Sequence, residues 1–207
     1  MRDLRKNAKQ RGVPAPFWPD DFSMAGEAPD KNELYYDAME LCSMDNKKAR
    51  EALQLLKRAL KLDGVYVQTY IGFASAYSAL GDKKKMEAAI KTAFEKTREM
   101  FPKWPKRLPW GILENRAPMR AIQYRADLHW HDQEYEQAIE LFRLLLRMNP
   151  NDNQGVRYEI AALYAGLTGE DINRMTDEGN EKQDWSEQEN LVAEQNAKHR
   201  FWTPPAA

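Results

Sequence analysis

The sequence predicts an all-α protein made of repeated helix–turn–helix units, and three observations lead to that fold class. Residues 48–63 and 135–150 can be aligned so that Ala52 falls on Ala138, and the apolar side chains that follow share one helical face. Met86 lies 34 residues after Ala52 and marks a third copy between the first two. Self-similarity at a period of this length is typical of stacked helical repeats.

Each copy carries one packing pattern in its second helix. The small Ala52 is followed four positions later by the bulky Leu56, and then by the small Ala59 before a turn at Asp63. The same pattern recurs later in the chain at Ala138, Phe142, Leu145 and Asn149. A small side chain lets the two helices of a unit approach closely, and positions spaced by four and three residues form one stripe. Pro150 ends the later helix because proline cannot continue it.

The first helices of the units are placed by counting back from these patterns. Residues 70–82 supply a first helix and the Gly-Asp turn of the second unit. We expect the first unit to open near Glu33 and the third near Met119. A further first helix over residues 154–165 then begins a fourth unit.

Together these residues resemble tetratricopeptide repeats over about residues 33–166. The later part of this range also resembles a subset of microbial tetratricopeptide proteins. The resemblance implies a short right-handed α-solenoid in which the first helix of every unit lines a concave groove. Three positions depart from the family pattern: Gly64 stands where proline is usual, Met86 replaces a small residue, and Glu40 takes a usual glycine or alanine site. These departures loosen single repeats and leave the period intact.

Charge and composition favour a soluble, cytoplasmic protein. Lysine and arginine total 31 against 32 acids, so the chain lacks the excess of positive charge that nucleic-acid binding needs. No apolar run approaches the roughly 20 residues that span a bilayer, and the basic N-terminus leads into no signal-like stretch. Cys42 is the single cysteine, which excludes an intramolecular disulfide. We therefore expect no nucleic-acid partner and no membrane association.

An insertion interrupts the repeats. Ala138 follows Ala52 by 86 residues, which is two periods of 34 plus 18. The excess falls at about residues 101–118, where four prolines forbid a continuous helix. Trp104 and Trp110 are too apolar for a solvated linker, so we expect the insertion to pack on the solenoid and form a rim of the groove. The alternative is packing on the convex side, where the insertion serves only stability.

The two ends of the chain are expected to differ. Residues 1–32 hold four prolines among aromatic side chains and are predicted to be extended and partly packed. Residues 167–207 are predicted to form a polar linker, a capping helix and a tail that contains Trp202. Ser186 is the expected N-cap of that helix, with Glu189 completing a capping box. Such a helix suits the end of a solenoid, whose last core face must be covered.

Signals for catalysis, cofactors or metals are weak. Asp127 and His131 share a helical face, but the sequence places no serine or cysteine for such a pair to activate. His129 and His131 project about 200° apart on a helix and cannot share a metal ion. Glycine-rich phosphate-binding motifs are absent from the sequence. We expect no cofactor, no metal site and no enzymatic activity, with an enzyme that uses Asp127 and His131 as a distant alternative.

The family resemblance implies which residues face the groove. The third and fourth units supply the candidates that most resemble a binding site: Arg120, Gln123, Asp127, Trp130, His131, Gln154, Arg157 and Tyr164. The first two units offer smaller or apolar residues at equivalent positions, such as Leu34 and Ile71. Arginine forks and aromatic plates suit a peptide carboxylate or an aromatic side chain.

The leading hypothesis is a scaffold that binds a peptide or protein segment in this groove. Chaperone-binding members of the family clamp a terminal carboxylate with lysine and asparagine at two groove positions. Here those positions hold Asp37 and Leu41, and then Ile71 and Ser75, so chaperone tails are disfavoured. The alternative hypothesis is self-association, as a homo-oligomer formed through the groove or the tails.

Overall fold

The computed structural model describes residues 29–44 and 46–205, so most of the predicted N-terminal segment lies outside the described residues. The described part consists of helices and loops, without strands. The helices are α2 (Lys31–Met44), α3 (Asn46–Leu62), α4 (Val67–Ala79), α5 (Lys83–Met100), α6 (Leu113–His131), α7 (Tyr135–Met148), α8 (Val156–Tyr164), α9 (Gly169–Lys182) and α10 (Ser186–His199). None of these is both long and apolar enough to cross a membrane.

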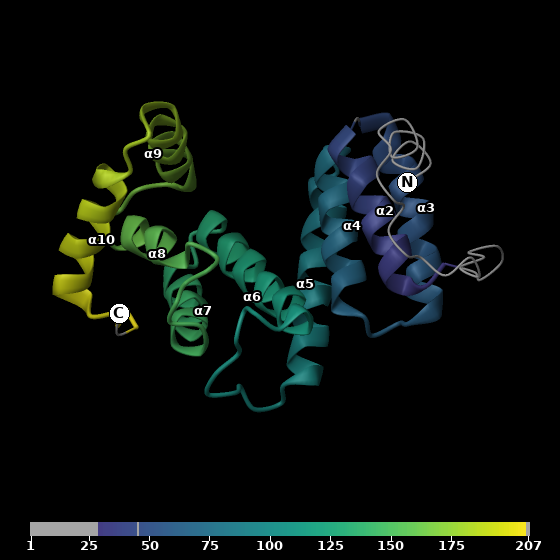
Figure 1. Cartoon of the computed structure of the whole chain (residues 1–207), viewed down its shortest axis with the longest axis horizontal. Helices are drawn as coiled ribbons and strands as arrows, with labels where there is room; N and C mark the ends of the chain where they lie inside the picture. Colours follow the sequence, from purple (N-terminus) through teal and green to yellow (C-terminus); the bar gives the residue numbers. More distant parts are fainter. Residues whose placement is uncertain (1–28, 45, 206–207) are drawn as a thin grey trace, which may run out of the picture.

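The helices stack in consecutive pairs. The pairs α2–α3, α4–α5 and α6–α7 pack most extensively within themselves, and each pair also packs on the next. In Figure 1 the chain runs from α2 and α3 on one side, through α6 in the middle, to α9 and α10 on the other. This arrangement confirms the predicted helical solenoid.

The predicted small-residue pattern is the packing core of each pair. Ala52 and Ala138 are fully buried, and so are the bulky Leu56 and Phe142 that follow them. Helix α4 also approaches α3 of the preceding pair so closely at Gly72 that a Cβ atom there would lie 2.5 Å from Leu56 Cδ2. Side-chain volume at these contacts is therefore restricted to what the sequence supplies.

The insertion does not interrupt the stacking of the second pair on the third. Ile71 of α4 and Ala93 of α5 share a buried cluster with Ala121 of α6. Helix α6 begins at Leu113, six residues before the predicted opening of the third unit near Met119, and it includes Pro118. Proline removes one backbone hydrogen bond inside a helix, and its ring is buried here. Packing thus allows a proline that sequence reasoning assigned to the loop.

The remaining insertion, residues 101–112, packs on the solenoid as expected. Leu108 is buried, and its backbone N–H donates to the Met148 carbonyl at 2.9 Å, at the end of α7. Trp104 lies against Phe94, with ring centroids 6.3 Å apart. Trp110 is also half-buried, so both indoles are withdrawn from water.

The predicted linker after residue 166 is wrong, because it contains the helix α9. A capping box starts this helix: the Asp171 N–H donates to Thr168 Oγ1 at 3.2 Å, and the Thr168 N–H donates to Asp171 Oδ2 at 2.9 Å. The sequence predicted Ser186 as the N-cap of α10, but the N-cap is Trp185. Ser186 is the first helical residue, and its hydroxyl donates to Asp184 Oδ1 at 2.6 Å.

Helix α10 covers α8, as a capping helix should. The tail that follows packs on the same chain. Phe201 is buried in the core of this half. The Asn196 side chain accepts a hydrogen bond from the Trp202 N–H and donates one to the Trp202 carbonyl, both at 2.9 Å. The Trp202 indole donates to the Pro150 carbonyl at 2.8 Å.

Candidate functional site

A hollow of about 990 Å³ lies between the C-terminal part of α6, helix α8 and the start of α9. We call it the α6–α8 hollow. Four of the predicted groove residues line it: Asp127, Trp130, His131 and Tyr164. Lining residues not predicted from the sequence include Tyr135, Glu159, Leu163 and Glu170. The first helices of the third and fourth units share its walls with the start of α7 and with the segment that leads into α9.

A polar ladder joins α6 to α8 beside the hollow. Gln154 Nε2 donates to Gln123 Oε1 at 2.7 Å, and Gln123 Nε2 donates to Glu159 Oε1 at 2.9 Å. Gln123 and Gln154, which were expected to face a ligand, instead hold each other and fix one oxygen of Glu159. The other oxygen, Glu159 Oε2, is buried and accepts no hydrogen bond from the described residues.

Asp127 and Glu159 are two half-buried acids in the wall of the hollow. Burial raises the pKa of Asp127 to about 7. Burial also raises the pKa of Glu159 well above its usual value, and the nearby charge of Asp127 adds to the increase. Among the described residues, none donates a hydrogen bond or an ion pair to Asp127. Two carboxyl groups without a basic partner among the described residues, both with raised pKa values, are the main electrostatic feature of the hollow.

Sequence reasoning missed Glu159, because it does not occupy a family groove position. The signal that was available is its neighbourhood: it directly precedes the apolar run Ile160–Leu163. An acid next to such a run on a short helix becomes partly buried when the run packs into the core. Helix α8 does this, since Ile160 and Ala161 are fully buried beside it.

His131 does not form the acid–imidazole pair that its spacing from Asp127 suggested. Its Nδ1 lies 3.2 Å from Asp132 Oδ1, and its Nε2 lies 3.2 Å from Lys83 Nζ. Both ring nitrogens therefore face other groups, and no proton relay to Asp127 is assembled. His129 pairs with Glu134. No group of three potential metal-ligating side chains is placed to hold a metal ion within the described residues.

The two predicted arginines do not line the hollow. Arg157 binds Asp152 and Glu189, each at 3.0 Å, and its guanidinium carbon lies 4.1 Å from the centre of the Tyr158 ring. Asp152 also accepts the N–H groups of Val156 and Arg157 at the start of α8. Arg157 thus links the start of α8 to α10 through its ion pairs. Its guanidinium group is therefore not presented to a ligand in the hollow, although the sequence suggested that it would be.

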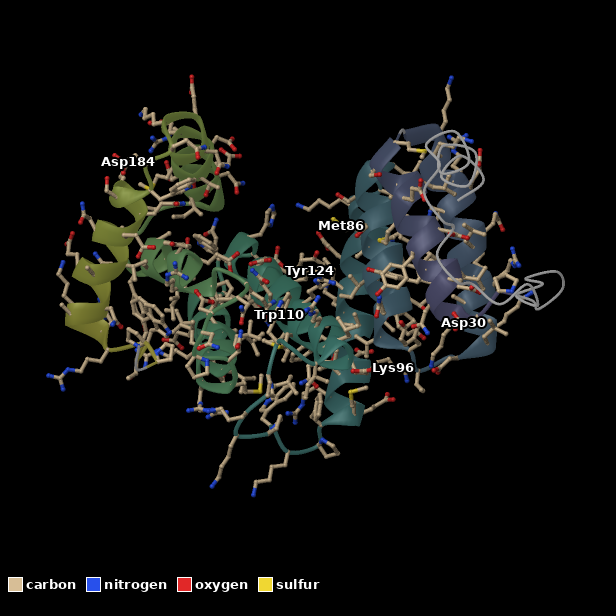
Figure 2. The ribbon with its side chains drawn as sticks, viewed as in Figure 1. Asp30, Met86, Lys96, Trp110, Tyr124 and Asp184 are labelled. Atoms are coloured by element: carbon tan, nitrogen blue, oxygen red, sulfur yellow. The ribbon has the colours of Figure 1, made fainter. Side chains whose placement is uncertain are left out.

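Arg120 lies with the insertion, since its guanidinium carbon is 5.5 Å from the centre of the Trp110 ring. Figure 2 places Trp110 and Tyr124 beside α6 in the middle of the molecule. Neither Trp104 nor Trp110, the predicted rim residues, lines the α6–α8 hollow. The insertion contacts the end of α7 through Leu108, whereas the hollow opens at the opposite end of that hairpin, near Tyr135.

The aromatic walls are held in place by neighbours. Trp130 meets Phe142 edge-on, with ring centroids 6.4 Å apart. Tyr164 stacks on His199 at 3.9 Å and accepts hydrogen bonds from Arg143. These contacts orient two rings of the lining before any ligand arrives.

Comparison with known proteins supports the repeat assignment. A family model described as tetratricopeptide repeat matches residues 67–95 and 121–152. The first match covers α4 and most of α5, and the second covers most of α6 and all of α7. No curated protein and no solved structure matches the chain.

Proposed function

Since the chain belongs to the tetratricopeptide repeat superfamily, whose repeats are generally protein-interaction modules, we propose that it is a scaffold binding an extended protein segment in the α6–α8 hollow. One observation carries this proposal: the first helices of two consecutive units, α6 and α8, both line a hollow of about 990 Å³. Most ligand sites in proteins have volumes of about 300–1,000 Å³. The aromatic side chains of Trp130, Tyr135 and Tyr164 supply the type of contact that dominates binding energy.

Catalysis is not part of the proposal. The family consists typically of non-enzymatic scaffolds, and both ring nitrogens of His131 face Lys83 and Asp132. Self-association stays a prediction, as does the cytoplasmic location. In the self-association alternative the Trp202 indole occupies a neighbour's groove, whereas here it donates to the Pro150 carbonyl of its own chain.

The proposal is tested by selecting short peptides from a random display library against the full chain. Tyr135 lines the hollow and its side chain is 49% exposed, so Tyr135→Ala should leave the fold intact. We expect this variant to weaken binding of the selected peptides by about tenfold, the loss of one moderate hot spot.

Tyr36 is the matched control, because it is an exposed tyrosine of the first unit, away from the hollow. Tyr36→Ala should bind the same peptides as wild type does. Failure to select any peptide, or an equal loss in both variants, would contradict a binding site at the hollow.

A further inference from the structure

Resting on the proposed function, we propose that the α6–α8 hollow recognises a cationic side chain, lysine or arginine, of the bound segment, through Asp127 and Glu159. The partner is then a basic peptide segment, and the carboxylate ligand that the sequence suggested is not the one this site fits.

The charge of the lining is one-sided. Asp127, Glu159 and Glu170 line the hollow, and none of its described lining residues is a lysine or an arginine. His131 is the single basic group in the lining, and it lies 3.2 Å from Lys83 Nζ. A segment bearing negative charge would meet like charges here, whereas a positive one meets opposite charges.

The acidic groups also lack partners of their own. One oxygen of Glu159 is held by Gln123, and the other is buried without a hydrogen-bond donor. Asp127 receives no hydrogen bond or ion pair from the described residues. Carboxyl groups withdrawn from water are ordinarily paired with a donor. Asp127 is half-buried and lines the hollow, so its carboxyl group is open to an external donor.

Arg157, which shares α8 with Glu159, is unable to serve as that donor. Arg157 is bound to Asp152 and Glu189, and its guanidinium group lies over the Tyr158 ring. Moving it would break those contacts and uncover the start of α8, where Asp152 caps two N–H groups. Lys83 lies against His131 at the edge of the hollow, and among the described residues no lysine or arginine pairs with Asp127 or Glu159, so a cationic ligand would supply a charge that these acids lack.

The shape of the hollow suits a long aliphatic stem with a charged tip. Leu163 and Ile139 offer apolar surface, and Trp130 offers an indole, in the same lining as the acids. Lysine and arginine place their methylene stems along apolar surface and extend the charged group beyond it. An aromatic ring near the cation adds a favourable cation–π contact.

The test uses short acetylated, amidated peptide libraries with random flanks and one fixed central residue: lysine, arginine, norleucine or glutamate. Norleucine keeps the stem of lysine and removes its charge. We expect the lysine and arginine libraries to bind about tenfold more tightly than the norleucine library, and the glutamate library to bind most weakly.

Asp127→Asn and Glu159→Gln should remove most of the preference for lysine over norleucine. Both substitutions replace a half-buried carboxyl group of raised pKa by a neutral amide of the same shape, so the variants should fold. Asp37→Asn is the matched control, since Asp37 is an exposed acid at a predicted groove position of the first unit, and it should keep the preference unchanged.

A dependence on pH gives a second readout. The groups that face Asp127 or line the same hollow are His131 and Tyr124 of α6, Tyr135 of α7, Glu159 of α8 and Glu170 of α9. Lys83 of α5 reaches the same edge through His131. Because the pKa of Asp127 is about 7, binding of the lysine library should strengthen from about pH 6 to about pH 8 as the carboxyl ionises. His131→Gln should keep this slope, and Asp127→Asn should reduce it.

The outcomes separate this inference from the proposed function. Equal binding of the norleucine and lysine libraries, with both sensitive to Tyr135→Ala, overturns the cationic preference and leaves peptide binding standing. The same holds if the glutamate library binds best. Absence of binding by every library overturns both.

Discussion

The two halves of the solenoid share one repeat pattern and present different inner surfaces. In α2–α5 the groove positions Leu34 and Ile71 are 2% and 3% exposed, so both side chains pack between helices and neither is available to a ligand. In α6–α10 the equivalent region contains a glutamine–glutamate ladder and a hollow. Polar side chains between first helices keep the helices apart and leave space, whereas apolar ones draw them together.

The two halves also differ in how the first helix of a unit is connected to the helix that packs on it. Helix α4 is joined to α5 by a tight turn, and α6 is joined to α7 by another. Between α8 and its covering helix α10 the chain inserts α9, whose start forms one wall of the hollow. The open inner surface of the second half thus depends on an extra helix as well as on polar residues.

The largest expected effect breaks the second half. Ala138 is fully buried where α7 meets α6, so Ala138→Trp has no room for an indole. We expect a loss of more than about 3 kcal/mol in the free energy of unfolding, beyond the usual 1–3 kcal/mol cost of overpacking. Thermal unfolding followed by circular dichroism measures it. Ala88→Trp, at an exposed position of α5, is the control, and equal melting of both variants would mean that the register is wrong.

A second prediction concerns the buried acid. The pKa of Asp127 is raised from 3.8 to about 7 by burial, so the folded protein binds this proton more tightly than the unfolded chain does. That stabilisation is fully present below about pH 4 and is lost as the pH rises through about 7. At about pH 8, Asp127→Asn should therefore raise the free energy of unfolding by roughly 2–3 kcal/mol, most of the cost of about three pKa units.

Urea unfolding at several pH values measures this gain. It should shrink towards acidic pH, where the wild-type carboxyl is protonated. Asp37 is an exposed acid on α2, so Asp37→Asn should change the free energy of unfolding little at any pH. A constant difference between Asp127→Asn and wild type across the range would contradict the assignment of the raised pKa to Asp127.

A third prediction tests whether the tail belongs to its own chain. Trp202→Ala removes a half-buried indole and its hydrogen bond to Pro150, so we expect about 1–2 kcal/mol of destabilisation. The loss should be the same in dilute and concentrated protein, because the contact is intramolecular. Light scattering on the wild type accompanies this measurement. A loss that appears only at high concentration would instead favour self-association through the tail.

The smallest expected effect compares two caps. Thr168→Ala removes a capping-box hydroxyl from α9 and should cost about 1 kcal/mol. Ser186→Ala removes a hydroxyl that donates to Asp184 outside the cap position, and it should cost less than about half of that. Chemical unfolding of both variants checks the order. The reverse order would restore Ser186 as the cap that the sequence suggested.

The sequence was informative where one local rule decides the structure. The spacing of Ala52, Leu56 and Ala59 predicts the helix pairs, because close packing imposes it at every repeat. It misled where two local signals competed. Gly169 and the polar residues around it suggested a linker, although Thr168 and Asp171 carry the spacing of a capping box. Pro118 suggested a loop, although its neighbours are buried.

The candidate site was harder to predict, because it depends on contacts between units. The family's groove positions include Asp127, Trp130 and Tyr164, which line one hollow. They gave no indication that Arg157 is held by Glu189, which lies 32 residues away. They also gave none that Glu159 lies in the hollow's wall. The charge of a groove depends on which ions are already paired within the fold, and one repeat considered alone does not contain that information.

The insertion and the tail give the second half another property, which concerns cooperativity. Units of a helical array contact only their neighbours, so such arrays can open one unit at a time. Arg107 donates to the Arg147 carbonyl across 40 residues, and Trp202 donates to Pro150 across 52. These links join the insertion before α6 and the tail beyond α10 to the end of α7. Helices α6–α8 and α10 should therefore open together and exchange their amide hydrogens as one slow block, while α2 and α3 exchange earlier and independently.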